Sequence, residues 1–227
     1  MYAFYATTGV TKWVAEIPGR FSTPPAIGES GTIYAGAGHE LLAFNPAGGS
    51  VDWRFTTPVA PPGYPAIHTI SSEPVVGSNG TIYFAALVDQ QQGALFAIHP
   101  DGYPKWSFSA GVSWLTSPLL AADGTIYFAA DKLHALDDFG REKWVKDGAG
   151  RMSPALAPDG SLYGGSHLNN SVFALATTGG GLLTAHWPAY GHDARHTSQH
   201  DDAFVCDAPT ITVQPVHQRI ASGATAS

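Results

Sequence analysis

Histidine is the residue type with which this chain could most directly do chemistry, since ten histidines occur among its 227 residues. Three of them, His39, His68 and His167, fall in segments that we expect to share one face of the fold, together with the carboxylate of Glu73. Neutral imidazoles and a carboxylate are suitable ligands for zinc, calcium or a similar divalent ion. With one open coordination position, such an ion would acidify a bound water and hydrolyse an ester, a lactone or a phosphotriester.

A second group of histidines, His192, His196 and His200, has i, i+4, i+8 spacing. On a helix this spacing would align the three imidazoles on one side, which makes the group a second candidate metal site. The alternative is structural, because the same segment could anchor the end of the fold through hydrogen bonds. The sequence leaves both interpretations open.

Candidate binding residues come from loops that we expect at the same end of the fold. Two of these loops, Val59 to His68 and Leu87 to Gly93, are longer than their counterparts elsewhere in the chain. Extended loops on a rigid scaffold are a common place for recognition of a small molecule, a peptide or a glycan. Packing between structural units is the alternative role for the tryptophan among them. The candidates are Arg20, His68, Trp114, Lys132, Arg151 and Asn169.

The elements that must position these residues are visible as an internal repeat. A Pro is followed six residues later by a Gly that opens a Gly-(Thr/Ser)-(Ile/Leu)-Tyr strand, and an apolar Leu-x-Ala-Leu-like strand comes next. A Gly turn and a Trp complete the first three copies. The four copies begin at Pro25, Pro74, Pro118 and Pro154, and the Trp residues are Trp13, Trp53, Trp106 and Trp144.

This repeat predicts an all-β fold, a β-propeller of four-stranded antiparallel blades, over residues 1–200. The Trp spacing of about 40 to 50 residues is typical of one blade, and the Gly-containing turns favour tight hairpins between strands. The chain begins inside a repeat, so about four and a half repeats are present, and Leu182 to Trp187 could supply the last outer strand. We therefore expect either five blades closed by the chain's own tail, or an open arc completed by self-association, which we favour.

The repeat resembles the PQQ-like (quinoprotein-type) β-propeller family. The residues that carry this resemblance are Ser-Pro…Asp-Gly-Thr-Ile-Tyr, Leu-x-Ala-Leu-Asp…Gly-x-x-x-Trp, and the segment from Trp187 to Thr197. The resemblance implies a ring of seven or eight blades. The family includes scaffold proteins, sensors and alcohol dehydrogenases. A quinoprotein dehydrogenase would be expected to show vicinal cysteines, calcium ligands and all blades, so bound PQQ is not expected here. Residues 201–227 resemble a linker and the start of a bacterial immunoglobulin-like module.

Composition narrows the classes of function. Net charge is −7 and no Lys/Arg cluster occurs, so we expect no nucleic-acid partner. No apolar run is long enough to span a bilayer, and the N-terminal residues do not form a signal peptide. No Gly-x-Ser-x-Gly or phosphate-binding loop motif is present. The sequence thus favours a non-catalytic binding or scaffold module of an exported protein, periplasmic or at the cell surface, with the metal-dependent hydrolase as the alternative.

Overall fold

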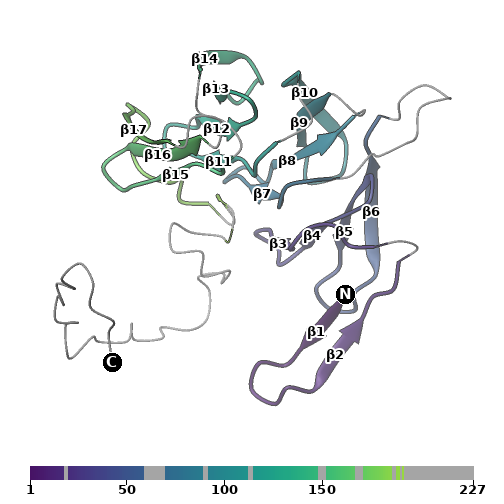
Figure 1. The fold of residues 1–227 in the computed structure, drawn as a ribbon. Coiled ribbons are helices and arrows are strands. Elements are labelled where there is room, and N and C mark those ends of the chain that lie inside the picture. Colours follow the sequence, from purple (N-terminus) through teal and green to yellow (C-terminus); the bar gives the residue numbers. More distant parts are fainter. Residues whose placement is uncertain are drawn as a thin grey trace, which may run out of the picture.

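The computed structural model describes residues 1–17, 20–58, 70–88, 92–111, 115–147, 152–166, 171–185, 188–189 and 191. These residues form seventeen strands and no helix, and the strands build five antiparallel sheets that follow one another in chain order (Figure 1). The all-β prediction is therefore confirmed. None of the described residues forms a helix long and apolar enough to cross a bilayer.

Three of the sheets are complete four-stranded blades, each with its shortest strand first. Blade 1 contains β3 (Ala26–Ile27), β4 (Ile33–Ala37), β5 (Glu40–Phe44) and β6 (Val51–Thr56). Blade 2 contains β7 (Val75–Val76), β8 (Ile82–Leu87), β9 (Gly93–Ile98) and β10 (Pro104–Ser109). Blade 3 contains β11 (Leu119–Leu120), β12 (Ile126–Ala129), β13 (Leu133–Leu136) and β14 (Glu142–Lys146).

The two remaining sheets are smaller and lie at the ends of the series. The N-terminal hairpin pairs β1 (Tyr2–Phe4) with β2 (Thr11–Val14). Sheet 4 contains β15 (Ala155–Leu156), β16 (Ser161–Ser166) and β17 (Ser171–Ala176). Within the described residues no fourth strand pairs with the outer edge of β17. The described residues therefore form an arc of blades with a two-stranded sheet at one end and a three-stranded sheet at the other.

The hydrophobic core is divided among the seams between neighbouring sheets. On β8, Ile82 and Phe84 pack toward blade 1, whereas Tyr83 and Ala85 pack toward blade 3. This alternation follows from the two-residue period of a strand, and both faces are buried because each complete blade lies between two neighbours. The sequences of the second and third strands of the blades are therefore nearly continuous apolar runs.

A recurring hydroxyl fixes the start of each complete blade. Two residues before the first Pro of the repeat, a Thr or Ser side chain accepts a hydrogen bond from the backbone N–H near the end of the second strand. The pairs are Thr23 with Gly36 (3.0 Å), Ser72 with Ala85 (2.7 Å) and Thr116 with Ala129 (2.9 Å). In sheet 4 this position is Met152, which lies against Gly165.

The segment that follows β17 takes a path that the sequence did not predict. Leu182 forms a β-bridge with Ala121, and the Leu183 N–H donates to the carbonyl of Leu120 at 2.8 Å. This part of the chain therefore lies on the free edge of β11, the innermost strand of blade 3. Wherever it is described, the stretch from Leu182 to Trp187 does not supply an outer strand for sheet 4, and that prediction is wrong.

Candidate functional site

The seams between sheets are held by the tryptophans of the repeat. Each of the first three indole N–H groups donates to a backbone carbonyl in the turn between the third and fourth strands of the next blade. The pairs are Trp13 with Pro46 (3.0 Å), Trp53 with Pro100 (2.9 Å) and Trp106 with Asp138 (2.8 Å). These tryptophans therefore pack between neighbouring blades.

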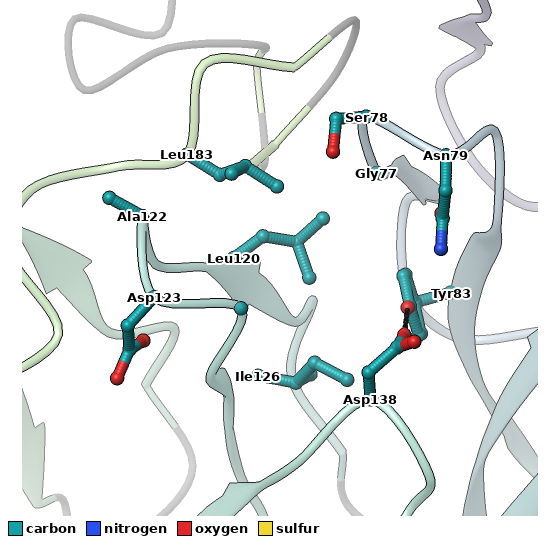
Figure 2. A pocket seen from close by; sticks show the side chains of 11 residues that line it. Gly77, Ser78, Asn79, Tyr83, Leu120, Ala122, Asp123, Ile126, Asp138 and Leu183 are labelled. Carbon is teal, nitrogen blue, oxygen red and sulfur yellow. Dashed lines mark hydrogen bonds between the residues drawn. The ribbon is translucent and has the colours of Figure 1, made fainter.

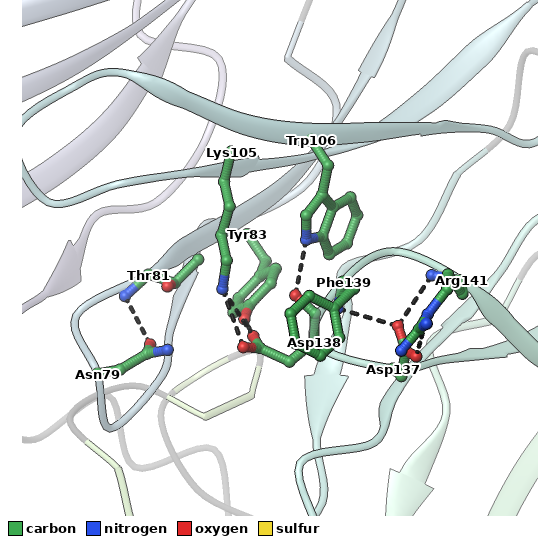
Figure 3. Close-up of polar contacts among 9 residues, drawn as sticks. All are labelled: Asn79, Thr81, Tyr83, Lys105, Trp106, Asp137, Asp138, Phe139 and Arg141. Atoms are coloured by element: carbon green, nitrogen blue, oxygen red, sulfur yellow. Dashed lines mark hydrogen bonds and ion pairs between the residues drawn. The ribbon is translucent and has the colours of Figure 1, made fainter.

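One seam carries a polar network in addition to the indole (Figure 3). The Tyr83 hydroxyl donates to the Asp138 carboxylate at 2.7 Å, and Lys105 Nζ lies 3.0 Å from both of its oxygens. Tyr83 and Lys105 belong to blade 2, whereas Asp138 belongs to the β13–β14 turn of blade 3. Burial, and then the adjacent Asp138 carboxylate, raise the pKa of Tyr83 well above its usual range. The phenol is thereby kept as a proton donor that joins the two blades.

A pocket of about 350 Å³ opens beside this network (Figure 2). Apolar side chains of Leu120, Ile126 and Leu183 form one part of its wall. Polar groups form the rest, and they come from the first turns of both blades, from β8 and from the β13–β14 turn. The polar lining residues are Ser78, Asn79, Tyr83, Asp123 and Asp138.

Both carboxylates of the pocket already face lysines, since Asp138 pairs with Lys105 at 3.0 Å and Asp123 with Lys143 at 3.4 Å. Burial alone would raise the pKa of Asp123, but its hydrogen bonds from Thr125 and the charge of Lys143 lower it below the usual value. The pocket thus presents hydrogen-bond acceptors rather than unpaired charge. It can hold a small polar molecule with an apolar side.

Glu73 lies at the inner end of blade 2 and is only 4% exposed. Its carboxylate oxygen Oε2 accepts a hydrogen bond from the backbone N–H of Gly191 at 3.1 Å, and its own N–H donates to Ser117 Oγ at 3.1 Å. The carboxylate therefore binds the segment that runs along the inner strands after β17. This structural contact differs from the predicted role in a metal site.

The other predicted metal ligands are not brought together by the described residues. His39 is exposed in the β4–β5 turn, whereas His68, His167, His192, His196 and His200 lie outside the described residues. In the part of the chain that is described, no group of three or more His, Cys, Asp or Glu side chains could hold a metal ion. Both metal sites stay predictions, and the hydrolase alternative gains no support from the structure.

The predicted loop face has the expected backbone arrangement. Phe21 bridges to Ala37 and Ile70 to Ala86, so the segments leading into the blades lie beside the ends of the second strands. Arg20 is exposed at this end. Lys132 forms an ion pair of 2.8 Å with Asp147, which raises the pKa of Lys132. The remaining candidates, His68, Trp114, Arg151 and Asn169, lie outside the described residues.

Sequence reasoning missed the Tyr83, Asp138 and Lys105 network. The repeat pattern predicts only that Tyr83 lies on a strand, and it predicts no role for Asp138. The signal was present in the repeat, because Lys105 directly precedes the seam residue Trp106 and Asp138 precedes the turn glycine of the following repeat by two positions. Superposing consecutive repeats, rather than reading each alone, would have brought the three residues together.

Stacked four-stranded sheets joined by tryptophan seams define an open arc of a β-propeller. Residues 43–205 match the family described as "Outer membrane protein assembly factor BamB", a group of PQQ-type repeats. The match extends over more than half of the chain, and the chain belongs to this family. No curated protein matches the sequence.

Solved structures show the same fold at low sequence identity. BamB from Moraxella catarrhalis is similar with a TM-score of 0.58 and 15% identity, over 76% of this chain and 51% of that structure. Quinohemoprotein alcohol dehydrogenase from Comamonas testosteroni is similar with a TM-score of 0.60 and 17% identity, over 81% of this chain and 39% of that structure. The computationally designed Ika8 protein has a TM-score of 0.59 and 12% identity, over 77% of this chain and 51% of its own. This chain therefore spans about half, or less, of these propellers.

Proposed function

We propose that this chain is a non-catalytic propeller module, a binding or scaffold platform whose exposed terminal faces associate with a second copy of the chain. The single observation that carries this proposal is the exposure of one repeated tyrosine. Tyr34, Tyr83 and Tyr127 occupy the same position in successive blades and are 4%, 3% and 2% exposed. Tyr163 occupies that position in sheet 4 and is 44% exposed. Among the described residues, none gives Tyr163 the covering that each blade gives to the preceding one.

The opposite end of the arc is also apolar and uncovered. Tyr2 and Phe4 of the N-terminal hairpin are 65% and 58% exposed, and their rings stack with centroids 6.1 Å apart. Trp13 and Ala3, on the other face of the hairpin, pack against blade 1. The exposed face therefore points away from the arc, where a preceding blade would lie. An exposed apolar surface of this kind marks an interaction site.

The two ends are complementary rather than alike. In the seams that follow blades 1, 2 and 3, the Tyr and Trp of one blade meet the back of the next, so Tyr163 presents a forward face and the pair Tyr2 and Phe4 presents a back face. Contact between unlike faces is heterologous and closes into a ring if the rotation allows it. Since 76% of this chain covers 51% of BamB from Moraxella catarrhalis, the matching parts of two copies are about the size of one such propeller. We therefore favour a head-to-tail pair.

The location and the ligands of the module are part of the same proposal. The family description, an outer membrane assembly factor, supports an exported bacterial protein acting in the periplasm or at the cell surface. The exposed Arg20 and the half-exposed Lys132 leave the loop face open to a small molecule, a peptide or a glycan. No step of this function requires a bound cofactor.

Sedimentation equilibrium from about 1 to about 500 µM, roughly the range of dissociation constants of weak interfaces, tests the association. The wild-type chain should form dimers with rising concentration. Tyr163→Asp should weaken dimerisation at least about tenfold, because a charge would be buried in the contact. Tyr103→Asp is the matched control, since Tyr103 is 70% exposed but lies in the β9–β10 turn away from both end faces. A wild-type chain that stays monomeric throughout, or equal effects of the two variants, would contradict the proposal.

A further inference from the structure

The seam between blade 3 and sheet 4 is built differently from the three before it. Trp144 contacts Tyr127, with ring centroids 5.6 Å apart, as the equivalent residues do in blades 1 and 2. Within the described residues, however, its indole N–H donates no hydrogen bond like those of Trp13, Trp53 and Trp106. The reason is the path of the chain after Thr178, which turns toward the inner strands, so that Asp123 N–H bonds to the Gly179 carbonyl at 3.1 Å.

This change of path leaves a pocket of about 490 Å³ in the seam. In the other seams a turn glycine covers the indole, whereas the equivalent glycine here, Gly179, lies nearest to Asp123 and Ala121. The pocket is formed by the end of β17 on one side and by β14 on the other. Its lining residues are Tyr127, Lys143, Trp144, Val145, Lys146, Leu175, Ala176, Thr177 and Thr178.

The seam between blades 2 and 3 shows which group this pocket lacks. There the Asp138 carboxylate receives the Tyr83 hydroxyl and the Lys105 ammonium (Figure 3). In the next repeat Tyr127 stands for Tyr83, Lys143 for Lys105 and Thr177 for Asp138. The phenol and the ammonium are therefore both present in the lining, but the residue between them carries no carboxylate.

The charges of the lining agree with this comparison. Lys143 Nζ makes its shortest contact, 2.6 Å, with the neutral hydroxyl of Thr125, and lies 3.4 Å from Asp123. Lys146 adds a second ammonium group, and no carboxylate lines the pocket among the described residues. Charge-assisted hydrogen bonds to a carboxylate are about twice as strong as neutral ones. The indole of Trp144 adds a flat apolar surface and an N–H donor.

We propose that this pocket binds a carboxylate attached to a flat apolar group, with Lys143 and Tyr127 as its donors and Trp144 beneath the apolar part. The carboxylate takes the position that Asp138 occupies in the preceding seam. A free aromatic acid and the C-terminal aromatic residue of a peptide share this chemistry. The site lies within one copy of the chain, so it does not depend on self-association.

Nitrogen-15 spectra of the six indole N–H groups provide a local readout, and Trp144→Phe assigns the resonance of Trp144. Benzoate should shift this resonance saturably, and benzamide, the neutral isostere, should bind at least about tenfold more weakly. Acetyl-Gly-Gly-Phe and its C-terminal amide form the peptide arm. Binding of benzoate alone indicates a small-molecule site, and binding of the tripeptide acid over its amide indicates a peptide terminus. Absence of both overturns the proposal.

Two variants test the residues directly. Thr177→Asp places an internal carboxylate where Asp138 lies in the preceding seam, and Lys143→Gln removes the ammonium, so each should weaken benzoate binding at least about tenfold. Lys12→Gln is the matched control, because Lys12 precedes Trp13 as Lys143 precedes Trp144, yet its ammonium donates to the Pro46 carbonyl. Unchanged benzoate binding in Thr177→Asp, or an equal loss in Lys12→Gln, would overturn the assignment.

Discussion

Replacing Gly140 with alanine tests whether the tryptophan seams hold the arc together. Gly140 lies in the β13–β14 turn at a φ of +76°, directly against the indole of Trp106. A Cβ at this position would approach Trp106 Cδ2 to 2.7 Å and Cε3 to 2.8 Å, closer than carbon atoms normally pack. Gly124, in the first turn of the same blade, has a φ of +80° but no atom within 4 Å of such a Cβ. The two glycines therefore differ only in the seam contact.

The expected cost follows from that difference. The left-handed conformation costs a non-glycine residue about 1–2 kcal/mol, and both variants share this term. Only Gly140→Ala also displaces the indole, which adds about 1–3 kcal/mol of overpacking and about 1 kcal/mol for the hydrogen bond between Trp106 and the Asp138 carbonyl. We expect Gly140→Ala to destabilise the chain by about 3–6 kcal/mol and Gly124→Ala by about 1–2 kcal/mol.

Thermal unfolding followed by far-UV circular dichroism measures this difference. At about 2–4 °C per kcal/mol for a chain of this size, the melting temperature of Gly140→Ala should lie well below that of Gly124→Ala. Tryptophan fluorescence should also change in the folded state of Gly140→Ala alone, because only there does the indole move. Equal losses of stability with unchanged fluorescence would refute the reasoning that the seam glycine is required by the indole.

Two further variants probe other contacts of the same blades. Burial and the Asp138 carboxylate raise the pKa of Tyr83 in the folded state. The phenol therefore contributes stability that is intact below about pH 10. This stability is lost at higher pH, because there the phenol ionises in the unfolded chain only. Tyr83→Phe should therefore flatten the alkaline decline of stability by up to about 1.4 kcal/mol per pH unit; parallel melting curves from pH 8 to 11 would contradict this. Thr116→Val should cost about 1–3 kcal/mol in chemical denaturation, because it leaves the buried N–H of Ala129 unpaired. The exposed Thr11→Val, on β2, should change stability little, and equal losses would mean that the Thr116 hydroxyl does not stabilise the blade.

The repeat could be predicted from the sequence because its signals are local. Gly80, Gly124 and Gly160 stand at the tips of predicted turns, and each adopts a positive φ, between 77° and 85°. The strands on either side follow from alternating or continuous apolar residues. Both kinds of signal depend on neighbours within a few positions, so one repeat is sufficient to interpret them.

The path after β17 could not be predicted, because it depends on a choice between two free strand edges. The outer edge of β17 and the inner edge of β11 both offer unpaired backbone groups, and Leu182 and Leu183 could satisfy either. In the structure they join β11, where their side chains also pack into the seams on both sides of blade 3. An edge strand on β17 would bury only one face. The extra burial is a three-dimensional property that the sequence pattern does not contain.

The exposed apolar side chains at the two ends of the arc determine how strongly copies of the chain can associate. Tyr2, Phe4, Tyr163 and Val172 are 44% to 85% exposed, and covering each would contribute roughly 1–2 kcal/mol, given about 1.5–3 kcal/mol for a fully buried side chain. A closed head-to-tail pair has two contacts, and each contact buries four such residues. Their burial roughly offsets the 4–15 kcal/mol that association costs in lost translational and rotational freedom. Pairing of separate copies should therefore be weak and concentration-dependent. Blades supplied within one polypeptide would cover the same faces without that cost. A ring of blades is therefore more stable when one chain provides more of them.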